Sequence, residues 1–183
     1  MVWRDTGLPW VPTSPHVPNG ESPLYQVATG MLGEVGGIST GIGYTLPFQC
    51  IAGPGLDPHK ICEALNNYKL PGVRFNPIVY KPYYFSFKDK EVGGAELFIT
   101  DPARAPLTAI NVYVLEALKK DCGHDMFAIA THTNHPFSMF DKVNGTDTTR
   151  KALQAGTSAS AIVASWKPGE DAFRDLRKKY LLY

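Results

Sequence analysis

DPHKICEALNNYKLPGVRFNPIVY, residues 57–80, has the clearest local pattern in this chain. Its first two residues, Asp57 and Pro58, are typical of a helix start, because a carboxylate accepts hydrogen bonds from free backbone N–H groups and proline fits the first turn. A proline–glycine pair at 71–72 ends that helix, and the next residues alternate between apolar and polar as in a half-buried strand. Apolar side chains follow the helix start at helical spacing: Ile61, Leu65 and Tyr68. The stretch therefore predicts a helix followed directly by a strand.

The residues that come later predict a second strand and several helices. Apolar residues alternate with polar ones over 93–100, which indicates a strand. An apolar stripe at helical spacing predicts a helix over about 106–120. We expect Asp147 to cap a short helix, and a last helix over about 160–179 that Pro168 should kink or split.

The part of the chain before residue 57 predicts a strand, a helix and another strand. Leu8–Thr13 reads as the first strand, and Ser22 followed by Pro23 predicts an N-cap and the first turn of a helix. A glycine-rich loop then leads to a strand at Phe48–Ala52. The whole order of elements is not a repeating βαβ series, so we expect an α+β (mixed α/β) fold. We place a seam near 53–55, which divides the chain into residues 1–54 and a compact α+β unit at 55–183.

The composition is that of a globular protein. Hydrophobic residues make up 44% and charged residues 19% of the 183 residues, which excludes a disordered chain and suits one domain or two small ones. Lys and Arg total 18 against 17 Asp and Glu, so the formal net charge is +1. This balance argues against a nucleic acid or an anionic membrane held by bulk charge. No run approaches the ~20 apolar residues of a membrane helix.

The cysteines and the first residues bear on the compartment. Cys50, Cys62 and Cys122 match no zinc motif, and we expect them to be buried free thiols. A single disulfide is the alternative if the protein is exported. Residues 1–7 lack the basic-then-apolar pattern of an export signal, so any such signal is expected upstream of them.

Two polar loops are candidates for a binding site. Ser14, His16, Asn19 and Glu21 follow the predicted strand and precede the helix, where α/β proteins place ligand sites. The alternative is a proline-stiffened turn whose polar groups satisfy backbone donors. The second loop, over 33–45, is rich in glycines that let backbone approach a ligand closely.

The second loop offers one carboxylate but no nucleotide site. It lacks the Walker lysine and the strand–loop–helix context of a phosphate loop, which excludes a nucleotide site. Glu34 at its start is either a carboxylate in a cleft or a solvated acid after a helix end.

Two further clusters have a functional and a purely structural interpretation. His132 and His135 have the spacing of two metal ligands, but no third ligand is evident, which favours a surface or interface pair. The aromatic cluster at 80–85 is either a stacking platform for a sugar or a plug between sheet and helix. Neither a nucleophile–base arrangement nor a pair of glycosidase carboxylates can be identified. We expect no metal and no cofactor.

Motifs along almost the whole chain resemble one branch, Bacteroidetes-like, of the exo-β-N-acetylmuramidase family, formerly defined as a domain of unknown function. The motifs keep their order from one end of the chain to the other. They are LPWVPTSPH at 8–16, TGMLGE at 29–34, GYTLPF at 43–48, LPGVRF at 70–75, KPYY at 81–84, ITD at 99–101, MFDKV at 139–143, GTD at 145–147 and KYLLY at 179–183.

The resemblance implies a glycoside hydrolase of cell-wall turnover that removes N-acetylmuramic acid from the non-reducing end of peptidoglycan fragments. It also implies a Rossmann-like catalytic half, a smaller C-terminal auxiliary domain and an active site between them. Residues 1–54 would then be the C-terminal end of the Rossmann-like domain and 55–183 the auxiliary domain. The family's catalytic carboxylates would lie in a first half outside this chain, so we expect the chain alone to be inactive or nearly so. Ile42 stands where many members have an arginine.

The resemblance and the loop positions together indicate one wall of a substrate cleft. We expect its binding residues to be Ser14, His16, Glu21, Glu34 and Tyr44, with hydrogen bonds to sugar hydroxyls or the acetamido group and stacking by Tyr44. Glu34 is also the candidate for an auxiliary catalytic role, because a desolvated carboxylate can act as general acid or base. The alternative is a non-catalytic module that binds peptidoglycan or another carbohydrate, or that has a structural role.

The same resemblance suggests the partners and the compartment. The expected partner is a peptidoglycan-derived sugar or muropeptide, with no nucleic acid and no membrane span. A bacterial, periplasmic or secreted location is implied. We also expect the isolated chain to self-associate, because the strands at 8–13 and 48–52 would have unpaired edges.

Overall fold

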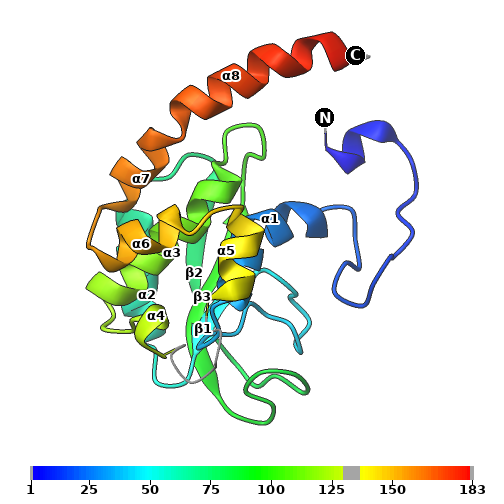
Figure 1. The fold of residues 1–183 in the computed structure, drawn as a ribbon. Helices are drawn as coiled ribbons and strands as arrows, with labels where there is room; N and C mark the ends of the chain where they lie inside the picture. The colour runs from blue at the N-terminus through cyan, green and yellow to red at the C-terminus, as the bar shows by residue number, and fades with distance from the viewer. Residues whose placement is uncertain (1, 130–136, 182–183) are drawn as a thin grey trace.

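The structure is a computed structural model, which describes residues 2–129 and 137–181 (Figure 1). It combines helices with one small antiparallel sheet, which confirms the expected α+β class. In chain order the elements are η1 (Trp3–Thr6), α1 (Ser22–Gly33), β1 (Cys50–Gly53), α2 (Pro58–Asn67), β2 (Val73–Tyr80), β3 (Val92–Ile99), α3 (Leu107–Lys120), α4 (Met126–Ile129), α5 (Ser138–Asn144), α6 (Thr148–Gln154), α7 (Ala159–Ser165), α8 (Lys167–Arg177) and η3 (Lys178–Tyr180).

The sheet has three strands in the order β1-β3-β2, and both pairs are antiparallel. Cys50 pairs with Glu96 at one end of the β1–β3 ladder, and Val73 pairs with Ile99 at one end of the β2–β3 ladder. The outer edge of β1 is partly covered, because Ser39 and Ala52 exchange backbone hydrogen bonds of 2.6 and 3.0 Å. The glycine-rich loop thus lies against the sheet as an incomplete fourth strand.

Side chains alternate between the two faces of the sheet, and each face packs against a different part of the chain. Ile51, Phe75 and Leu97 point into a core formed with α1, α2 and α3, and all three are nearly inaccessible. On the opposite face Cys50 and Tyr80 belong to a separate small cluster, which is covered by parts of two loops rather than by helices. These two loops, the glycine-rich loop (residues 36–48) and the β2–β3 loop (residues 81–91), shape the site described below.

The N-terminal segment differs from the prediction. Residues 8–13 form no strand, and Ser14 and Val17 make only an isolated bridge. Pro9 and Pro12 remove backbone donors from this stretch, which is instead an arm held by its own tryptophans: Trp3 Nε1 donates to the Leu8 carbonyl at 3.1 Å. The predicted strand was therefore wrong, because Pro9 and Pro12 cannot donate the backbone hydrogen bonds that would pair it with a sheet.

Helix boundaries follow the predictions more closely. α1 begins at Ser22, so Glu21 rather than Ser22 occupies the N-cap position. Asn19 Oδ1 accepts hydrogen bonds from the backbone N–H groups of both residues. The expected break at Pro168 is confirmed, because the last helix is split into α7 and α8. The predicted strand at the end of the glycine-rich loop is β1, displaced to Cys50–Gly53.

Residue 54, the expected domain boundary, lies between two strands of one sheet. β1 before it pairs with β3 after it, and Leu32 and Ile110 belong to the same core cluster. The division into 1–54 and 55–183 stays a prediction, and in this structure it cuts through a continuous core.

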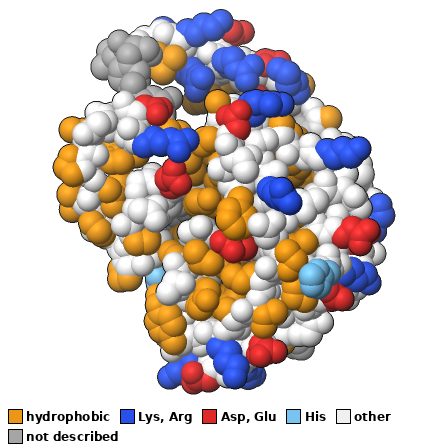
Figure 2. All heavy atoms as spheres, turned by 180° about the vertical axis from the view of Figure 1, so that it is seen from behind, with side chains coloured by type: hydrophobic (Ala, Val, Ile, Leu, Met, Phe, Trp, Pro, Cys, Tyr) orange, Lys and Arg blue, Asp and Glu red, His pale blue; other side chains and the backbone are white. Residues whose placement is uncertain are grey.

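The cysteines are all free, and Cys50 and Cys62 are buried as expected, whereas Cys122 is half-buried. Burial raises the pKa of the Cys50 thiol to about 12 and that of Cys62 to about 11, so both are protonated at neutral pH. Among the described residues, no helix combines the length and the apolar character needed to cross a membrane. Viewed from behind, apolar side chains gather below a margin of basic side chains on α8 (Figure 2).

Candidate functional site

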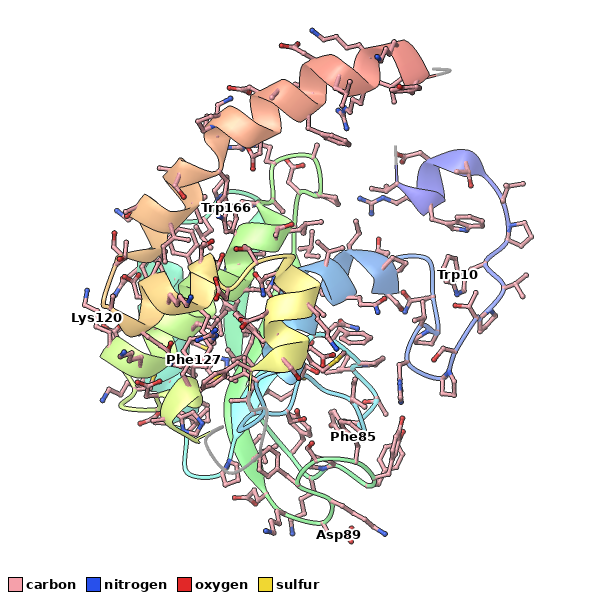
Figure 3. All side chains as sticks on the ribbon, viewed as in Figure 1. Trp10, Phe85, Asp89, Lys120, Phe127 and Trp166 are labelled. Carbon is pink, nitrogen blue, oxygen red and sulfur yellow. The ribbon has the colours of Figure 1, made fainter. Side chains whose placement is uncertain are left out.

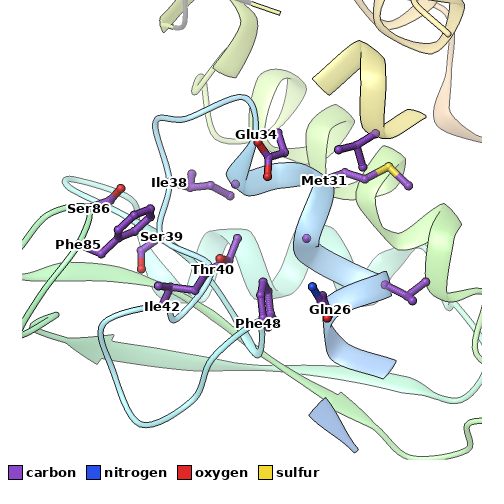
Figure 4. Close-up of a pocket in the computed structure, with 14 residues that line it drawn as sticks. Gln26, Met31, Glu34, Ile38, Ser39, Thr40, Ile42, Phe48, Phe85 and Ser86 are labelled. Atoms are coloured by element: carbon purple, nitrogen blue, oxygen red, sulfur yellow. The ribbon is translucent and has the colours of Figure 1, made fainter. Parts of the chain in front are cut away.

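A pocket of about 490 Å³ opens between α1, the glycine-rich loop, the β2–β3 loop and α5 (Figure 4). One side of α1 forms one wall, and Phe85 stands on the other side of the pocket from Met31 (Figure 4). The full lining is Gln26, Val27, Gly30, Met31, Gly33, Glu34, Ile38, Ser39, Thr40, Ile42, Phe48, Phe85, Ser86 and Val143. A pocket of this size and mixed lining is large enough for a small ligand.

The backbone around the pocket is fixed by close contacts. Phe48 has a φ of 64°, a left-handed conformation that is rare for an aromatic residue. Its carbonyl accepts a 2.7 Å hydrogen bond from the buried Thr29 hydroxyl, which ties the loop to α1. At Gly41 a Cβ would lie 2.0 Å from the Leu46 carbonyl oxygen, so only glycine fits there.

Hydroxyl and amide groups supply the polar part of the lining. Ser39 Oγ accepts a 2.8 Å hydrogen bond from the Tyr80 hydroxyl, and burial holds the Tyr80 pKa well above its usual value. Tyr80 therefore stays a neutral donor and orients Ser39. Gln26 and Ser86 are exposed at the margin, where their side chains are free to meet a ligand.

Glu34 is the one charged residue among the described residues that line the pocket. It is the C-cap of α1, and its backbone N–H contacts the Met31 carbonyl at 3.2 Å. A carboxylate at the negative end of a helix gains nothing from the helix dipole, so local helix stability does not account for this residue. The pocket can offer one acid or base and several neutral hydrogen-bonding groups. Burial also raises the pKa of the Glu96 carboxyl, but Glu96 lies on β3 and is not a lining residue.

Of the five expected site residues, the structure places Glu34 in the pocket. The Tyr44 ring is instead stacked on Tyr80, with 4.4 Å between ring centroids, and it packs against the small cluster on the second face of the sheet. Glu21 lies on the surface and pairs with Arg4 at 3.1 Å. Neither Tyr44 nor Glu21 belongs to the lining.

Ser14 and His16 are not part of the pocket lining. His16 Nε2 is 2.6 Å from the Tyr84 hydroxyl, and the two rings are stacked at 5.8 Å. Ser14 Oγ accepts from the His16 backbone N–H at 3.2 Å, which supports the turn. The expectation that both follow the end of a strand was wrong, because no strand forms there; their link to the β2–β3 loop comes from tertiary contact.

Several lining residues were absent from the sequence-based set. Gln26 and Met31 are ordinary residues on one side of a helix, Phe48 belonged to a predicted strand, and Val143 comes from a helix that was not predicted. Phe85 was part of the aromatic cluster at 80–85, whose exposed and buried members only the structure separates. Ile42, which stands where many members of the resembled family have an arginine, is also a lining residue.

The described residues contain no group of three His, Cys, Asp or Glu side chains that could hold a metal ion. His132 and His135 lie outside the described residues.

Comparison with known proteins places these features in a family. A sequence profile described as "Exo-beta-N-acetylmuramidase NamZ, C-terminal" matches residues 24–183. Peptidoglycan beta-N-acetylmuramidase NamZ of Bacillus subtilis (strain 168) is 31% identical over 183 residues, which are 100% of this chain and 42% of that protein. The crystal structure of a DUF1343 family protein from Bacteroides fragilis NCTC 9343 has a TM-score of 0.92 and 34% identity, and covers 100% of this chain and 47% of that one. The chain thus spans less than half the length of both relatives.

Proposed function

This chain belongs to the family of C-terminal domains of the exo-β-N-acetylmuramidase NamZ, and from that premise we propose that it is part of a glycoside hydrolase that acts on peptidoglycan. The reaction we propose is release of N-acetylmuramic acid from the non-reducing end of peptidoglycan fragments. Within that protein, the chain supplies one wall of the substrate cleft. The observation that carries the proposal is the match to a named muramidase along the entire chain.

The chemistry of the pocket supports this assignment. A pyranose has polar hydroxyls around its rim and apolar C–H groups on its faces, so it needs hydrogen-bonding side chains beside flat apolar ones. Gln26, Ser86 and Glu34 are the polar groups at the pocket, and Met31, Phe48 and Phe85 are apolar. The pocket lacks a basic residue among its described lining, which suits the neutral part of the sugar.

A second candidate function is a binding module without hydrolysis of its own. One observation favours it for the chain in isolation: the described lining holds a single carboxylate, whereas glycosidases generally use two. Calorimetric titration of the isolated chain with muropeptides separates the two. Saturable binding supports the module, whereas no binding supports a cleft that needs both halves of the protein.

The decisive test of the proposed function uses the natural protein at its full length and a chromogenic β-N-acetylmuramide. We expect release of the sugar by the wild type, and no release across the tested pH range would refute the activity. Glu34→Gln keeps the size of the side chain and removes its ability to exchange a proton. If Glu34 handles protons, turnover should fall by roughly 10²-fold or more.

The pattern of kcat and KM decides the role of Glu34. A raised KM with unchanged kcat assigns it to binding alone. No change in either constant removes it from the site and leaves a solvated acid after α1. Glu170→Gln is the matched control, because Glu170 is an exposed carboxylate on α8 outside the pocket lining, and its kinetics should equal those of the wild type.

A further inference from the structure

We propose that Phe85 is the stacking platform of this site, against which the apolar face of an amino-sugar ring lies. The inference rests on the proposed function and assigns to it a residue on the β2–β3 loop. Phe85 lines the pocket, yet 68% of its surface is exposed. Figure 3 shows its place on the loop between β2 and β3. An aromatic ring held open at a pocket margin is a surface that a ligand can cover.

Folding does not account for the position of this ring. Phe85 has a φ of 65°, and such a left-handed backbone costs a non-glycine residue energy. Because most of the ring is in water, its burial returns little of that cost. Phe87 and Asp89 of the same loop share this left-handed conformation, but only Phe85 lines the pocket. Strained residues cluster at binding and active sites, so the strain of this loop agrees with a ligand-binding role for Phe85.

The loop that carries Phe85 is held in place by hydrogen bonds to the glycine-rich loop, within itself and to the N-terminal arm. Tyr83 N–H donates to the Gly43 carbonyl at 2.7 Å, and Asp89 N–H donates to the Pro82 carbonyl at 2.8 Å. The hydroxyl of Tyr84, the residue before Phe85, meets His16 Nε2 of the N-terminal arm at 2.6 Å. The ring is therefore presented by a fixed loop, and a ligand pays little to order it.

The other aromatic residues of the cluster already have partners. Tyr80 is buried and stacked on Tyr44, and Tyr84 is stacked on His16. Tyr83 is exposed but lies outside the described pocket lining. Phe85 is thus the member whose flat face and position at the pocket suit a sugar, with the polar side chains of α1 across from it (Figure 4).

The test compares variants that differ in the flat ring alone. Phe85→Leu keeps an apolar side chain and the same backbone strain but removes the aromatic face, whereas Phe85→Tyr keeps it. Binding of methyl β-N-acetylmuramide is measured by calorimetry, and KM and kcat for the chromogenic muramide are measured on the natural full-length protein. We expect Phe85→Leu to weaken affinity and raise KM by roughly 3- to 10-fold with kcat little changed. Phe85→Tyr should retain the affinity and the KM of the wild type.

Two controls separate the loss of a sugar contact from an unspecific effect of the substitution. Phe173→Leu changes a similarly exposed phenylalanine on α8, outside the pocket lining, and it should leave KM unchanged. Thermal unfolding of Phe85→Leu should match that of the wild type, because the ring is mostly in water. A wild type that binds and hydrolyses the sugar while Phe85→Leu is indistinguishable from it overturns the assignment of Phe85 alone. A wild type that does neither overturns the proposed function and this inference with it.

Discussion

Gly43 is the residue at which the glycine-rich loop and the β2–β3 loop meet. Its φ is 87°, and a Cβ at this position would lie 2.0 Å from the carbonyl oxygen of Tyr84. Two loops that come from distant parts of the sequence can approach this closely only because the side chain is absent. The position of Phe85 in the pocket lining therefore depends on a glycine that is not itself a lining residue.

Gly43→Ala is expected to destabilise the fold more than the same change at Gly36. Gly36 has a similar φ of 82°, but nothing lies within 4 Å of a Cβ there, so it isolates the cost of the backbone conformation. That cost is about 1–2 kcal/mol, and the clash at Gly43 should add about 1–3 kcal/mol. Urea unfolding of both variants measures the difference. Equal losses would mean that the two loops separate freely.

At the scale of the element, α2 shows how a local signal acts through hydrogen bonds. Asp57 Oδ1 accepts from the backbone N–H groups of His59 and Lys60 at 2.8 and 3.2 Å. These hydrogen bonds, first that from Lys60, hold the pKa of the Asp57 carboxyl below its usual value. A carboxyl with a lowered pKa in the folded state stabilises the protein above its unfolded pKa, and loses that contribution as the pH falls through the folded value.

Asp57→Ala should therefore destabilise the chain at neutral pH, and the deficit should shrink in acid. The difference in stability should begin to shrink as the pH falls to the ordinary pKa of 3.8 and should shrink further below it. Guanidinium unfolding at a series of pH values measures the difference between wild type and variant. Ser158→Ala is the control, because Ser158 caps α7 through a hydroxyl that does not titrate, and its deficit should stay constant. If the stability lost in Asp57→Ala were the same at every pH, the ionised Asp57 carboxylate would not be what stabilises the start of α2.

At the scale of the molecule, two parts extend from the body: the N-terminal arm and α8 (Figure 1). No residue of α8 is buried, and its apolar side chains Phe173 and Leu176 are 62% and 52% exposed. Val11 of the arm is 73% exposed. The opposite side of α8 is charged, with ion pairs such as Arg174 with Asp171 at 2.9 Å. The exposed apolar side of such an amphipathic helix is a surface on which another molecule can pack.

The isolated chain is therefore expected to self-associate as its concentration rises. The apolar side of α8 replaces the strand edges as the expected cause, since residues 8–13 form no strand and the edge of β1 is partly covered by Ser39. Light scattering over a concentration series measures the mass. Phe173→Asp combined with Leu176→Asp should yield monomer, whereas Ala161→Asp with Ala164→Asp adds equal charge on α7 and should not. A monomeric wild type at high concentration would contradict the prediction.

The sequence by itself determined the elements whose signals are local. The Asp57–Pro58 start of α2, the alternation of β2 and β3, the stripe of α3 and the break at Pro168 depend on residues a few positions apart, and each is present in the structure. The family was also evident from the chain alone, because short motifs persist in order along it. Glu34, which lies next to a glycine-rich loop, was identified on the same local grounds and lines the pocket.

Only the tertiary structure decided which side chains share the pocket. Residues 8–13 were predicted to form a strand, but they have no sheet partner in the structure. Tyr44 was predicted to stack on a sugar, but its ring is stacked on Tyr80. Phe85, Phe48 and Val143 come from three separate elements and meet because the sheet, α1 and α5 pack around one opening. Contacts between residues so far apart depend on the packing of the whole core, and hydrophobic packing is non-directional, so no local pattern specifies them.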